Sequence, residues 1–219
     1  EKNIKNVDVF KVEIPKEGKI SSEGYENFSR YGINSADVSF GAHLLDFMEN
    51  TTRGRFAKKL LGKRSYRWLA PFVAMGFEGG DIEIKVNGQT RIESKENGII
   101  ANWQNSKSAG GEIAFCPQAE VDDGTFDFIF YERRNRFHFP IKLLRQAKSG
   151  KFQRYNGTTP LNDVKHLEIF ALHGDLGRNL TIDGEHYKFQ KPFRKAKFEG
   201  TSNTLRFIYN KQEPISSSI

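Results

Sequence analysis

The sequence predicts an α+β fold that is mainly antiparallel β: a β-sandwich with two or three packed helices. Short segments with apolar residues at every second position recur along the 219 residues, and turn signals such as Asn87-Gly88 separate them. The regular alternation of strands and helices that is typical of a parallel sheet is absent from the sequence. With 37% hydrophobic and 13% aromatic residues, the chain has enough apolar material for one packed core. We expect one domain over residues 1–211 and a tail over 212–219.

The expected elements follow from the apolar periodicity. Strands are predicted where β-branched and aromatic residues alternate with polar ones or form short apolar runs: 6–14, part of 31–40, 82–86, 98–103, 111–116, 126–131, 164–173, 179–182 and 205–209. Helices are predicted where apolar residues recur three or four positions apart: 40–50, 54–75 and 139–148. Gly62 is expected to interrupt the second helical segment and Pro71 to kink or end it. Gly79-Gly80-Asp81 is expected to be a loop that enters a hairpin.

Composition excludes several classes of protein. The single cysteine, Cys116, excludes a disulfide framework and a cysteine-based zinc site. No stretch approaches the roughly 20 consecutive apolar residues that a membrane-spanning helix needs. The aromatic content, together with an ordinary share of charged residues, excludes a disordered chain.

The positive charge of the chain is concentrated in one place. The sequence holds 34 Lys and Arg against 27 Asp and Glu, a formal net charge of +7. Residues 53–67, here called the basic segment, contain no acidic residue and seven basic ones: Arg53, Arg55, Lys58, Lys59, Lys63, Arg64 and Arg67. The rest of the chain is therefore neutral. Such a segment is typical of contact with phosphate in a nucleic acid, a nucleotide or an anionic membrane; the alternative is a solvated helix face.

An acidic turn over residues 120–125 separates two predicted strands. Aspartate followed by glycine, as in Asp123-Gly124, commonly closes a turn for local reasons, because the side chain caps the turn and glycine accepts a positive φ. The functional interpretation is a hard-cation site. One carboxylate with turn carbonyls would suit Mg²⁺ or Ca²⁺, which prefer oxygen ligands.

A second pair of acidic residues ends the segment 179–185, NLTIDGE. If the strand stays extended, Asp183 and Glu185 point to the same side, since side chains two positions apart share a face. Paired carboxylates can orient a nucleophile or accept its proton. The alternative is an ordinary Asp-Gly hairpin turn.

The order and spacing of these motifs resemble a known family. The run SAGGEIAFCPQAEVDDGTFD, the later Lys148-Ser149-Gly150-Lys151 and the strand that ends in Ile182-Asp183-Gly184-Glu185 resemble the C-terminal domain of the diacylglycerol kinase-like lipid kinases. This family includes bacterial lipid kinases, sphingosine kinases and ceramide kinases. Asn34-Ser35-Ala36 with Phe40-Gly41, and the Gly62–Tyr66 segment, extend the resemblance, which covers about residues 8–185.

The chain departs from that family in one respect. The kinases carry an N-terminal nucleotide-binding domain with a Gly-Gly-Asp-Gly-Thr motif, and this sequence contains no such motif: Ile82 follows Gly79-Gly80-Asp81. The sequence thus begins where the family's second domain begins. A fragment of a longer protein and a free-standing relative without ATP binding both remain open.

The resemblance implies a β-sandwich domain that holds a lipid acceptor. It assigns Glu185 to activating or orienting the lipid hydroxyl, with Asp183 beside it. It places Mg²⁺ at the side chain of Asp123, with backbone oxygens of Glu120 and Thr125. ATP would be bound mainly by the N-terminal ATP-binding domain, and the protein would be cytoplasmic and peripherally membrane-associated. One carboxylate aimed at the attacking hydroxyl suits phosphoryl transfer, which mainly needs positioning and charge neutralisation.

The leading hypothesis is the lipid-acceptor domain of an ATP-dependent lipid kinase, which would be inactive without the nucleotide-binding domain. Its acyl pocket would be lined by apolar residues that helical spacing equally assigns to the core: Phe40, Leu44, Phe47, Trp68 and Phe72. The alternative is a non-catalytic module that binds lipid and an anionic membrane surface. We do not expect a nucleic-acid partner, because few aromatic residues interleave with the basic segment. Diacylglycerol, sphingosine, ceramide and phosphatidylglycerol-like lipids remain open as acceptors.

Overall fold

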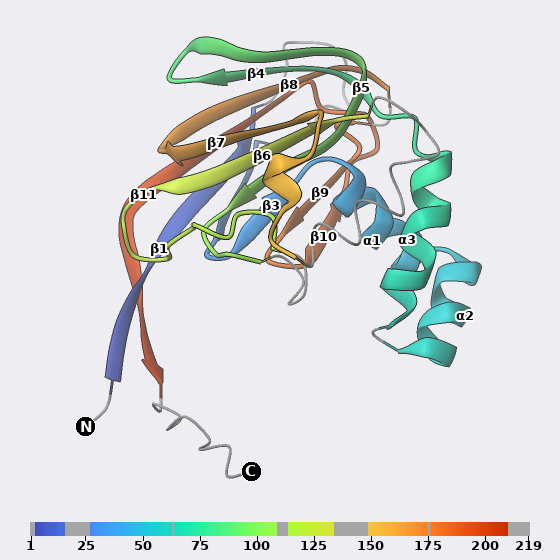
Figure 1. Cartoon of the computed structure of the whole chain (residues 1–219), viewed down its shortest axis with the longest axis horizontal. Coiled ribbons are helices and arrows are strands. Elements are labelled where there is room, and N and C mark those ends of the chain that lie inside the picture. Colours follow the sequence, from blue (N-terminus) through green and yellow to red (C-terminus); the bar gives the residue numbers. More distant parts are fainter. Residues whose placement is uncertain are drawn as a thin grey trace.

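The computed structural model describes residues 3–15, 27–62, 64–108, 114–133, 149–174 and 176–209. These residues form eleven antiparallel strands in one strongly curled sheet, with three α-helices and one short 3-10 helix (Figure 1). The α+β, mainly antiparallel prediction is confirmed. The strands are β1 Asn3–Ile14, β2 Phe28–Gly32, β3 Ser35–Asp37, β4 Gly80–Val86, β5 Gln89–Gln104, β6 Phe126–Glu132, β7 Thr158–Val164, β8 His166–Gly174, β9 Asn179–Ile182, β10 Glu185–Lys188 and β11 Lys195–Tyr209. The helices are α1 Phe40–Asn50, α2 Thr52–Leu61, α3 Arg64–Gly76 and the 3-10 turn Phe152–Arg154.

Strand β5 organises the sheet. The sheet runs in the order β10-β9-β3-β5-β4-β8-β11-β1-β2, and β6 and β7 branch from β5. Along its 16 residues β5 pairs with β4, β3 and β6, so it belongs to two parts of the sheet at once. Because of this branching, the sheet curls over itself, and its two parts pack their inner faces against one shared core.

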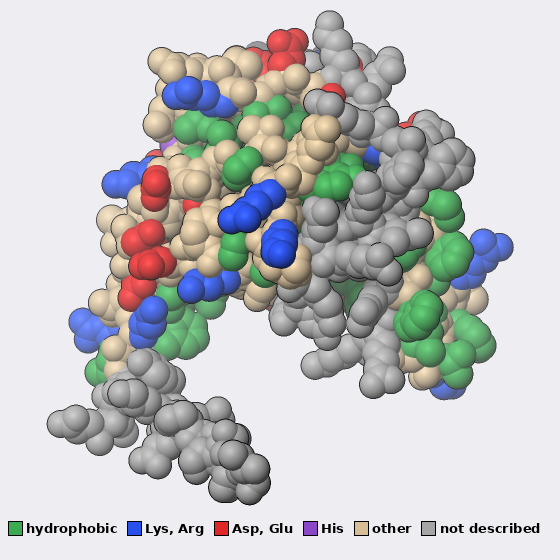
Figure 2. Space-filling model, in the orientation of Figure 1, with side chains coloured by type: hydrophobic (Ala, Val, Ile, Leu, Met, Phe, Trp, Pro, Cys, Tyr) green, Lys and Arg blue, Asp and Glu red, His purple; other side chains and the backbone are tan. Residues whose placement is uncertain are grey.

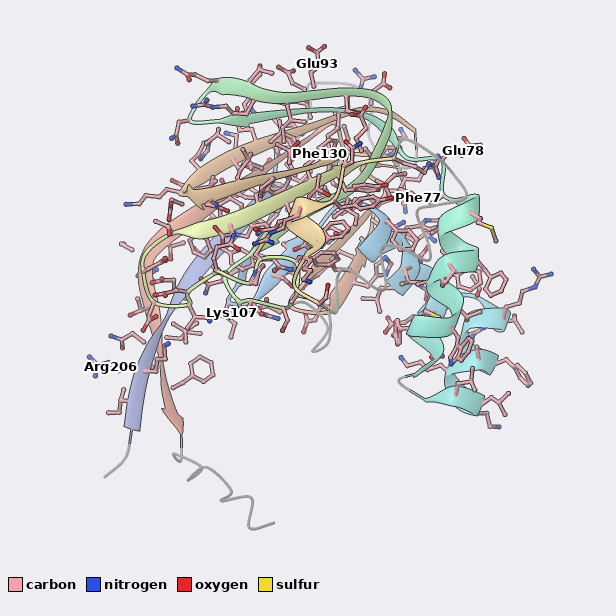
Figure 3. All side chains as sticks on the ribbon, viewed as in Figure 1. Phe77, Glu78, Glu93, Lys107, Phe130 and Arg206 are labelled. Atoms are coloured by element: carbon pink, nitrogen blue, oxygen red, sulfur yellow. The ribbon has the colours of Figure 1, made fainter. Side chains whose placement is uncertain are left out.

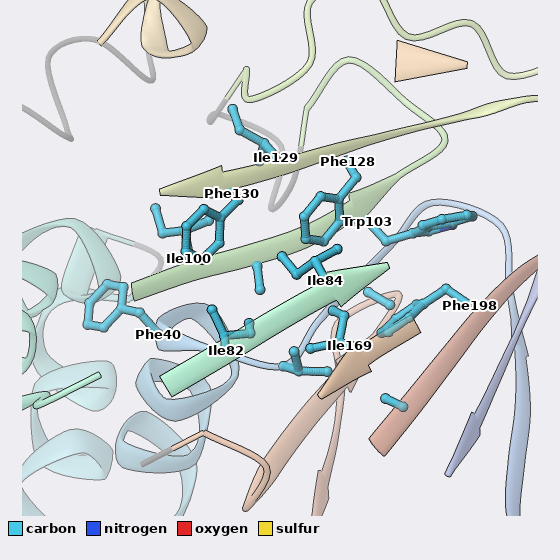
Figure 4. Packing of buried hydrophobic residues seen from close by; sticks show 14 of the residues in the cluster. Phe40, Ile82, Ile84, Ile100, Trp103, Phe128, Ile129, Phe130, Ile169 and Phe198 are labelled. Atoms are coloured by element: carbon cyan, nitrogen blue, oxygen red, sulfur yellow. The ribbon is translucent and has the colours of Figure 1, made fainter. Parts of the chain in front are cut away.

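Large aromatic and β-branched side chains fill that core (Figure 4). Trp103 of β5 is fully buried and stacks on Phe126 and Phe198, with ring centroids 5.1 and 5.7 Å away. Phe10 of β1 meets Trp103 and Phe126 edge-on. Strands from both halves of the chain therefore contribute to one hydrophobic centre, and aromatic pairs of this geometry add stability beyond the area they bury.

The three helices gather at one end of the sheet (Figure 1). Helix α1 packs against β9 and β10 on one side and against α2 and α3 on the other. Asp37, in the short strand β3, accepts hydrogen bonds from the backbone N–H of Ser39 and of Ala42 at 2.8 and 3.0 Å, so it fixes the start of α1. Burial raises the pKa of this carboxyl group, although these N–H groups oppose the rise.

The segment predicted as one broken helix forms α2 and α3. The break falls at Gly62, which has a φ of +56°. Pro71, by contrast, lies inside α3 and does not end it. The residues directly after α3 are held by buried Arg133, whose guanidinium donates hydrogen bonds to the carbonyl oxygens of Phe77 at 2.9 Å and Glu78 at 3.2 Å. None of the described helices is long and apolar enough to cross a bilayer.

Several strand predictions are corrected by the structure; β5, for example, begins at Gln89, nine residues before the predicted start at Gly98. Residues 114–116, the described part of the predicted strand 111–116, are not extended into a ladder. The predicted strand 164–173 is interrupted at Lys165, and β7 before it was not predicted because Pro160 and polar residues hide its pattern. Strand β10 was also missed, and β11 begins ten residues before the predicted start at Leu205. The predicted helix 139–148 and the tail 212–219 lie outside the described residues.

Candidate functional site

The carboxylate of Asp183 binds the backbone of residues 33–35, about 150 positions earlier in the sequence. Asp183 and Gly184 have φ values of +53° and +87° and form the tight turn between β9 and β10. The carboxylate accepts hydrogen bonds from the N–H groups of Ile33, Asn34 and Ser35 at 2.8, 2.8 and 3.0 Å. The extended geometry on which the paired-carboxylate interpretation depended does not occur. Both oxygens of this carboxylate therefore hold the backbone of residues 33–35 in place.

The same segment, residues 33–36, is held from its other side by β5 and the residues after it. Asn105 donates its side-chain amide to the carbonyl oxygens of Ile33 and Asp8, both at 2.9 Å. The hydroxyl of Ser106 donates a hydrogen bond to the side chain of Asn34. Two sequence motifs about 150 residues apart, Asn34-Ser35-Ala36 and Asp183-Gly184-Glu185, therefore form one structural unit.

Glu185 begins β10 and is exposed to solvent. Its Oε2 accepts a hydrogen bond from the hydroxyl of Tyr187 at 2.7 Å. The Tyr187 ring packs edge-on against Phe28, with centroids 5.0 Å apart, and the guanidinium of Arg30 lies over both rings. Burial, followed by the hydrogen bond to Glu185, raises the pKa of the Tyr187 hydroxyl, which therefore stays protonated and keeps donating at neutral pH.

Helix α1 is connected to β10 by an ion pair. Lys188 Nζ lies 2.9 Å from Oδ2 of Asp46, and His186 Nε2 lies 3.9 Å from Oδ1 of the same residue. Burial would raise the pKa of Asp46, but hydrogen bonds from Asn50 and Lys188 outweigh it and the pKa is lowered. Burial lowers the pKa of His186. The strand that carries Glu185 is thus fixed to the helical end of the domain.

The acidic turn lines a cavity of about 290 Å³. Asp123 Oδ1 accepts hydrogen bonds from the backbone N–H and the hydroxyl of Thr125 at 2.9 and 3.0 Å, which is the local turn geometry expected of an Asp-Gly sequence. The N–H of Gly124 donates to Asp8 Oδ2 at 2.7 Å, so this turn is anchored to β1. The cavity is lined mainly by oxygen-bearing side chains: Gln118, Ala119, Glu120, Asp123, Thr125, Phe126, Asp127, Asn162 and Asp163.

Asp127 is a residue of this cavity that sequence reasoning missed. It is buried, and burial together with the nearby charges of Asp163 and Asp123 raises its pKa to about 6. Its position two residues after Thr125 could have indicated that Asp127 belongs to the acidic turn. Asp163 reaches the cavity from β7, and no sequence pattern predicts its presence there. A hard cation would relieve the repulsion between these carboxylates, and the oxygen donors suit Mg²⁺. No group of three or more His, Cys, Asp or Glu within the described ranges is close enough to hold a metal by itself.

The five residues expected to line an acyl pocket are not brought together. Phe40 is buried and packs against Phe77, with ring centroids 5.8 Å apart, and Leu44 and Phe47 pack against the core. Trp68 and Phe72 instead lie on the outer surface of α3, 65% and 66% exposed. The first three residues therefore belong to the core or pack against it, whereas the other two lie on an exposed helix face.

The described basic side chains of the basic segment lie on α2. Arg53, Arg55, Lys58 and Lys59 are all exposed. Lys58 pairs with Glu49 of α1 at 3.6 Å and lies over the ring of Tyr66. Lys63 is outside the described residues, as are the side chains of Arg64 and Arg67.

An antiparallel, curled sheet with helices at one end defines a β-sandwich-like domain of a class found in kinases. In fold, 95% of the chain matches 55% of a diacylglycerol kinase of Bacillus anthracis, with a TM-score of 0.54 and 15% identity. It also matches 44% of a yeast NADH kinase solved with NADH, over 94% of this chain, with a TM-score of 0.51 and 8% identity. At these identities the likeness is one of fold.

Residues 43–191 match the model of the YegS C-terminal NAD kinase beta sandwich-like domain, and the chain belongs to this family. A protein of Shewanella frigidimarina named "Probable lipid kinase YegS-like" is 27% identical over 183 residues. The match covers 82% of this chain and 52% of the relative, so the chain spans about half of the relative's length. The matched range contains Asp123, Asp183 and Glu185.

Proposed function

We propose that this domain holds the lipid acceptor of an ATP-dependent lipid kinase and presents Glu185 to the acceptor hydroxyl. One observation carries the proposal: Asp183 uses its carboxylate to fix the turn, and this leaves Glu185 exposed at the next strand's first residue. The kinase names of the family's relatives support the reaction class. The relative named "Probable lipid kinase YegS-like" supports a lipid as the acceptor.

Glu185 is assigned two tasks: it aligns the acceptor hydroxyl and it accepts the proton of that hydroxyl. Phosphoryl transfer depends mainly on positioning and charge neutralisation, so a carboxylate that accepts a hydrogen bond from the acceptor hydroxyl aligns it for attack on the γ-phosphate. The proton of the hydroxyl passes to that carboxylate as the new P–O bond forms and the bond from the γ-phosphorus to the bridging oxygen breaks, with ADP as the leaving group. Tyr187 fixes the orientation of the carboxylate, and Asp183 fixes the turn.

The reaction would also need ATP and Mg²⁺. ATP would be bound mainly by an N-terminal domain, consistent with a relative about twice as long as the match. Mg²⁺ would be held at the acidic turn by Asp123, with oxygens of Glu120 and Thr125. The ion would supply charge neutralisation and rigidity to that turn.

The test is phosphate transfer from ATP to diacylglycerol, sphingosine and ceramide by the longest protein that the gene encodes. Glu185→Gln should lower kcat by about 10²–10⁴-fold, the range for loss of a general base. Glu93→Gln is the matched control, since Glu93 is an exposed glutamate of β5 that lies at the top of the view, away from helices α2 and α3 (Figure 3). Equal activity of the two variants would refute the assignment of Glu185.

We also propose that the basic segment faces an anionic membrane surface, where a lipid acceptor would be found. The four exposed basic side chains of α2 carry no acidic neighbour in sequence, and a bilayer rich in anionic lipid attracts such segments. If the domain were a non-catalytic binding module, it would bind vesicles while the longest gene product transfers no phosphate to any lipid.

A further inference from the structure

The helices α2 and α3 expose an unusual amount of apolar surface. The exposed apolar residues of this helical hairpin, here called the apolar face, are Phe56, Leu60, Leu61, Trp68, Phe72 and Met75. Four of them are about two-thirds exposed, as large side chains rarely are in a domain that buries its other aromatic residues well. Figure 2 shows hydrophobic side chains gathered over these helices, with basic side chains at the edge of the group.

Helical geometry explains why these residues share one side. In α3, Trp68 and Phe72 are four residues apart and Met75 follows three later, which places them on one face. Ala70, Val73 and Ala74 lie between them in sequence and are buried against the domain. Helix α3 thus has an apolar inner face that packs in the core and a second apolar face that is exposed to solvent. Phe56 and Leu60 of α2 repeat the four-residue spacing.

The charge of the hairpin decides what can cover this face. Arg53, Arg55, Lys58 and Lys59 are exposed on the same helix as Phe56 and Leu60. Residues 53–67 contain no acidic residue, while the remainder of the chain is neutral. A second copy of this surface would bring like charges together, which disfavours a symmetric dimer here. An anionic bilayer offers both complements: acidic headgroups for the basic side chains and acyl chains for the apolar ones.

We propose that the α2–α3 hairpin is an interfacial anchor that inserts the side chains of its apolar face into an anionic lipid bilayer. The proposal deepens the proposed function, on which it rests for its choice of occupant. Trp68 suits such a position because indole prefers the boundary between headgroups and acyl chains. Insertion, and not charge alone, then provides most of the affinity, since each large apolar side chain that leaves water contributes roughly tenfold or more.

The structure fixes the anchor to the domain at both of its ends. Thr51 caps α2 through the N–H of Gly54 at 3.0 Å, and a side chain at Gly54 would place its Cβ 2.6 Å from Cα of Met48 in α1. At the other end, Arg133 donates hydrogen bonds to the carbonyl oxygens of Phe77 and Glu78, directly after α3. The turn at Gly62 lies between these attachments, where nothing would surround an added Cβ. An anchor of this build can enter a bilayer without unfolding.

The experiment is vesicle binding by the 219-residue chain, followed by sedimentation and by tryptophan fluorescence. Vesicles of phosphatidylcholine are compared with equimolar phosphatidylcholine and phosphatidylglycerol. Only two tryptophans are present, and Trp103 is fully buried, so a blue shift of emission reports Trp68. We expect binding to the anionic vesicles with a blue shift, and weakening of roughly 100-fold in Trp68→Ser/Phe72→Ser.

A matched control replaces two exposed apolar side chains elsewhere. Leu205→Ser/Phe207→Ser changes two exposed apolar residues of β11, far from the hairpin in sequence, and should leave vesicle binding unchanged. Arg55→Ser/Lys59→Ser should weaken binding to the anionic vesicles and leave binding to pure phosphatidylcholine vesicles unchanged. High salt should weaken binding of the wild type to the anionic vesicles.

Three results would overturn the anchor. These are no binding to anionic vesicles, equal binding by Trp68→Ser/Phe72→Ser and the wild type, and a wild-type dimer that the same double variant converts to monomer. Failure of the anchor is separable from failure of the kinase proposal. Phosphorylation of a lipid dispersed in detergent by the longest gene product, with no vesicle binding, would leave the reaction intact and remove only the anchor. Vesicle binding without any lipid phosphorylation would do the reverse.

Discussion

The hydroxyl of Tyr187 donates a hydrogen bond to Oε2 of Glu185, two residues earlier on the same strand, at a distance of 2.7 Å. The bond leaves the second carboxylate oxygen of Glu185 available to a partner. Because the Tyr187 ring is itself packed against Phe28 and covered by Arg30, the orientation of the exposed carboxylate is fixed by a rigid neighbour. Positioning of this kind affects turnover more than ground-state binding.

Removing that hydroxyl should slow the reaction without abolishing it. In Tyr187→Phe we expect kcat to fall by about tenfold with little change in KM, because one hydrogen bond to a charged group is lost while the ring remains packed. The measurement is steady-state lipid phosphorylation by the longest gene product. Tyr66→Phe, which changes a partly exposed tyrosine of α3, is the control. A change confined to KM would contradict the positioning role.

The turn at Asp183 should contribute measurable stability. Asp183→Asn keeps a residue that tolerates the φ of +53° but removes the charge from three hydrogen bonds, and we expect a loss of about 1 kcal/mol of unfolding free energy. Asp183→Ala removes the acceptor as well and should lose about 2 kcal/mol. Urea unfolding of the isolated chain measures both. Equal stability of Asp183→Ala and the wild type would show that the carboxylate does not hold the segment 33–35.

Stability should fall as the pH rises through the titration of Asp127. Its pKa is about 6 in the folded chain, above the ordinary value of 3.8. Between these values the unfolded chain has released the proton while the folded chain keeps it, so the unfolded state gains relative stability. The full penalty, about 3 kcal/mol, is reached above pH 6 and is absent below the unfolded value. Asp127→Asn should remove it, so unfolding curves of variant and wild type should diverge with pH. Parallel curves would contradict the raised pKa.

Mg²⁺ should stabilise the wild type through the acidic turn. We expect the Tm of the isolated chain to rise with Mg²⁺ concentration, since an ion that binds the folded state shifts unfolding by mass action. Asp123→Asn should lose most of this rise. Asp122→Asn is the matched control, because Asp122 is the adjacent exposed aspartate and pairs with Lys5 at 3.3 Å. If both variants respond to Mg²⁺ as the wild type does, the ion binds elsewhere.

Local patterns determined which parts of the fold could be predicted. Helix α1 occupies the predicted residues 40–50, and the Asn87-Gly88 turn joins β4 and β5, because periodicity and turn chemistry act within a few residues. The break at Gly62 was equally readable. Strand β7 was not, since its stability comes from pairing with β6 and not from its own sequence, which includes Pro160.

The candidate site shows the same division. Motif order indicated Glu185, Asp183 and Asp123, but the role of Asp183 depends on N–H groups of residues 33–35, which only the folded chain brings near. Asp163 reaches the acidic cavity from β7 for the same reason. Residue identity predicted the chemistry available, whereas tertiary contact decides which carboxylates are engaged and which are exposed.

Helix α1 connects two parts of the domain. It packs so closely on α2 that a Cβ at Gly54 would meet Met48, and its Asp46 pairs with Lys188 on the strand that begins with Glu185. The α2–α3 hairpin and the strand that carries Glu185 are therefore attached to the same helix. A substitution in α1 can thus disturb both at once, even though it touches neither the apolar face nor the Glu185 carboxylate.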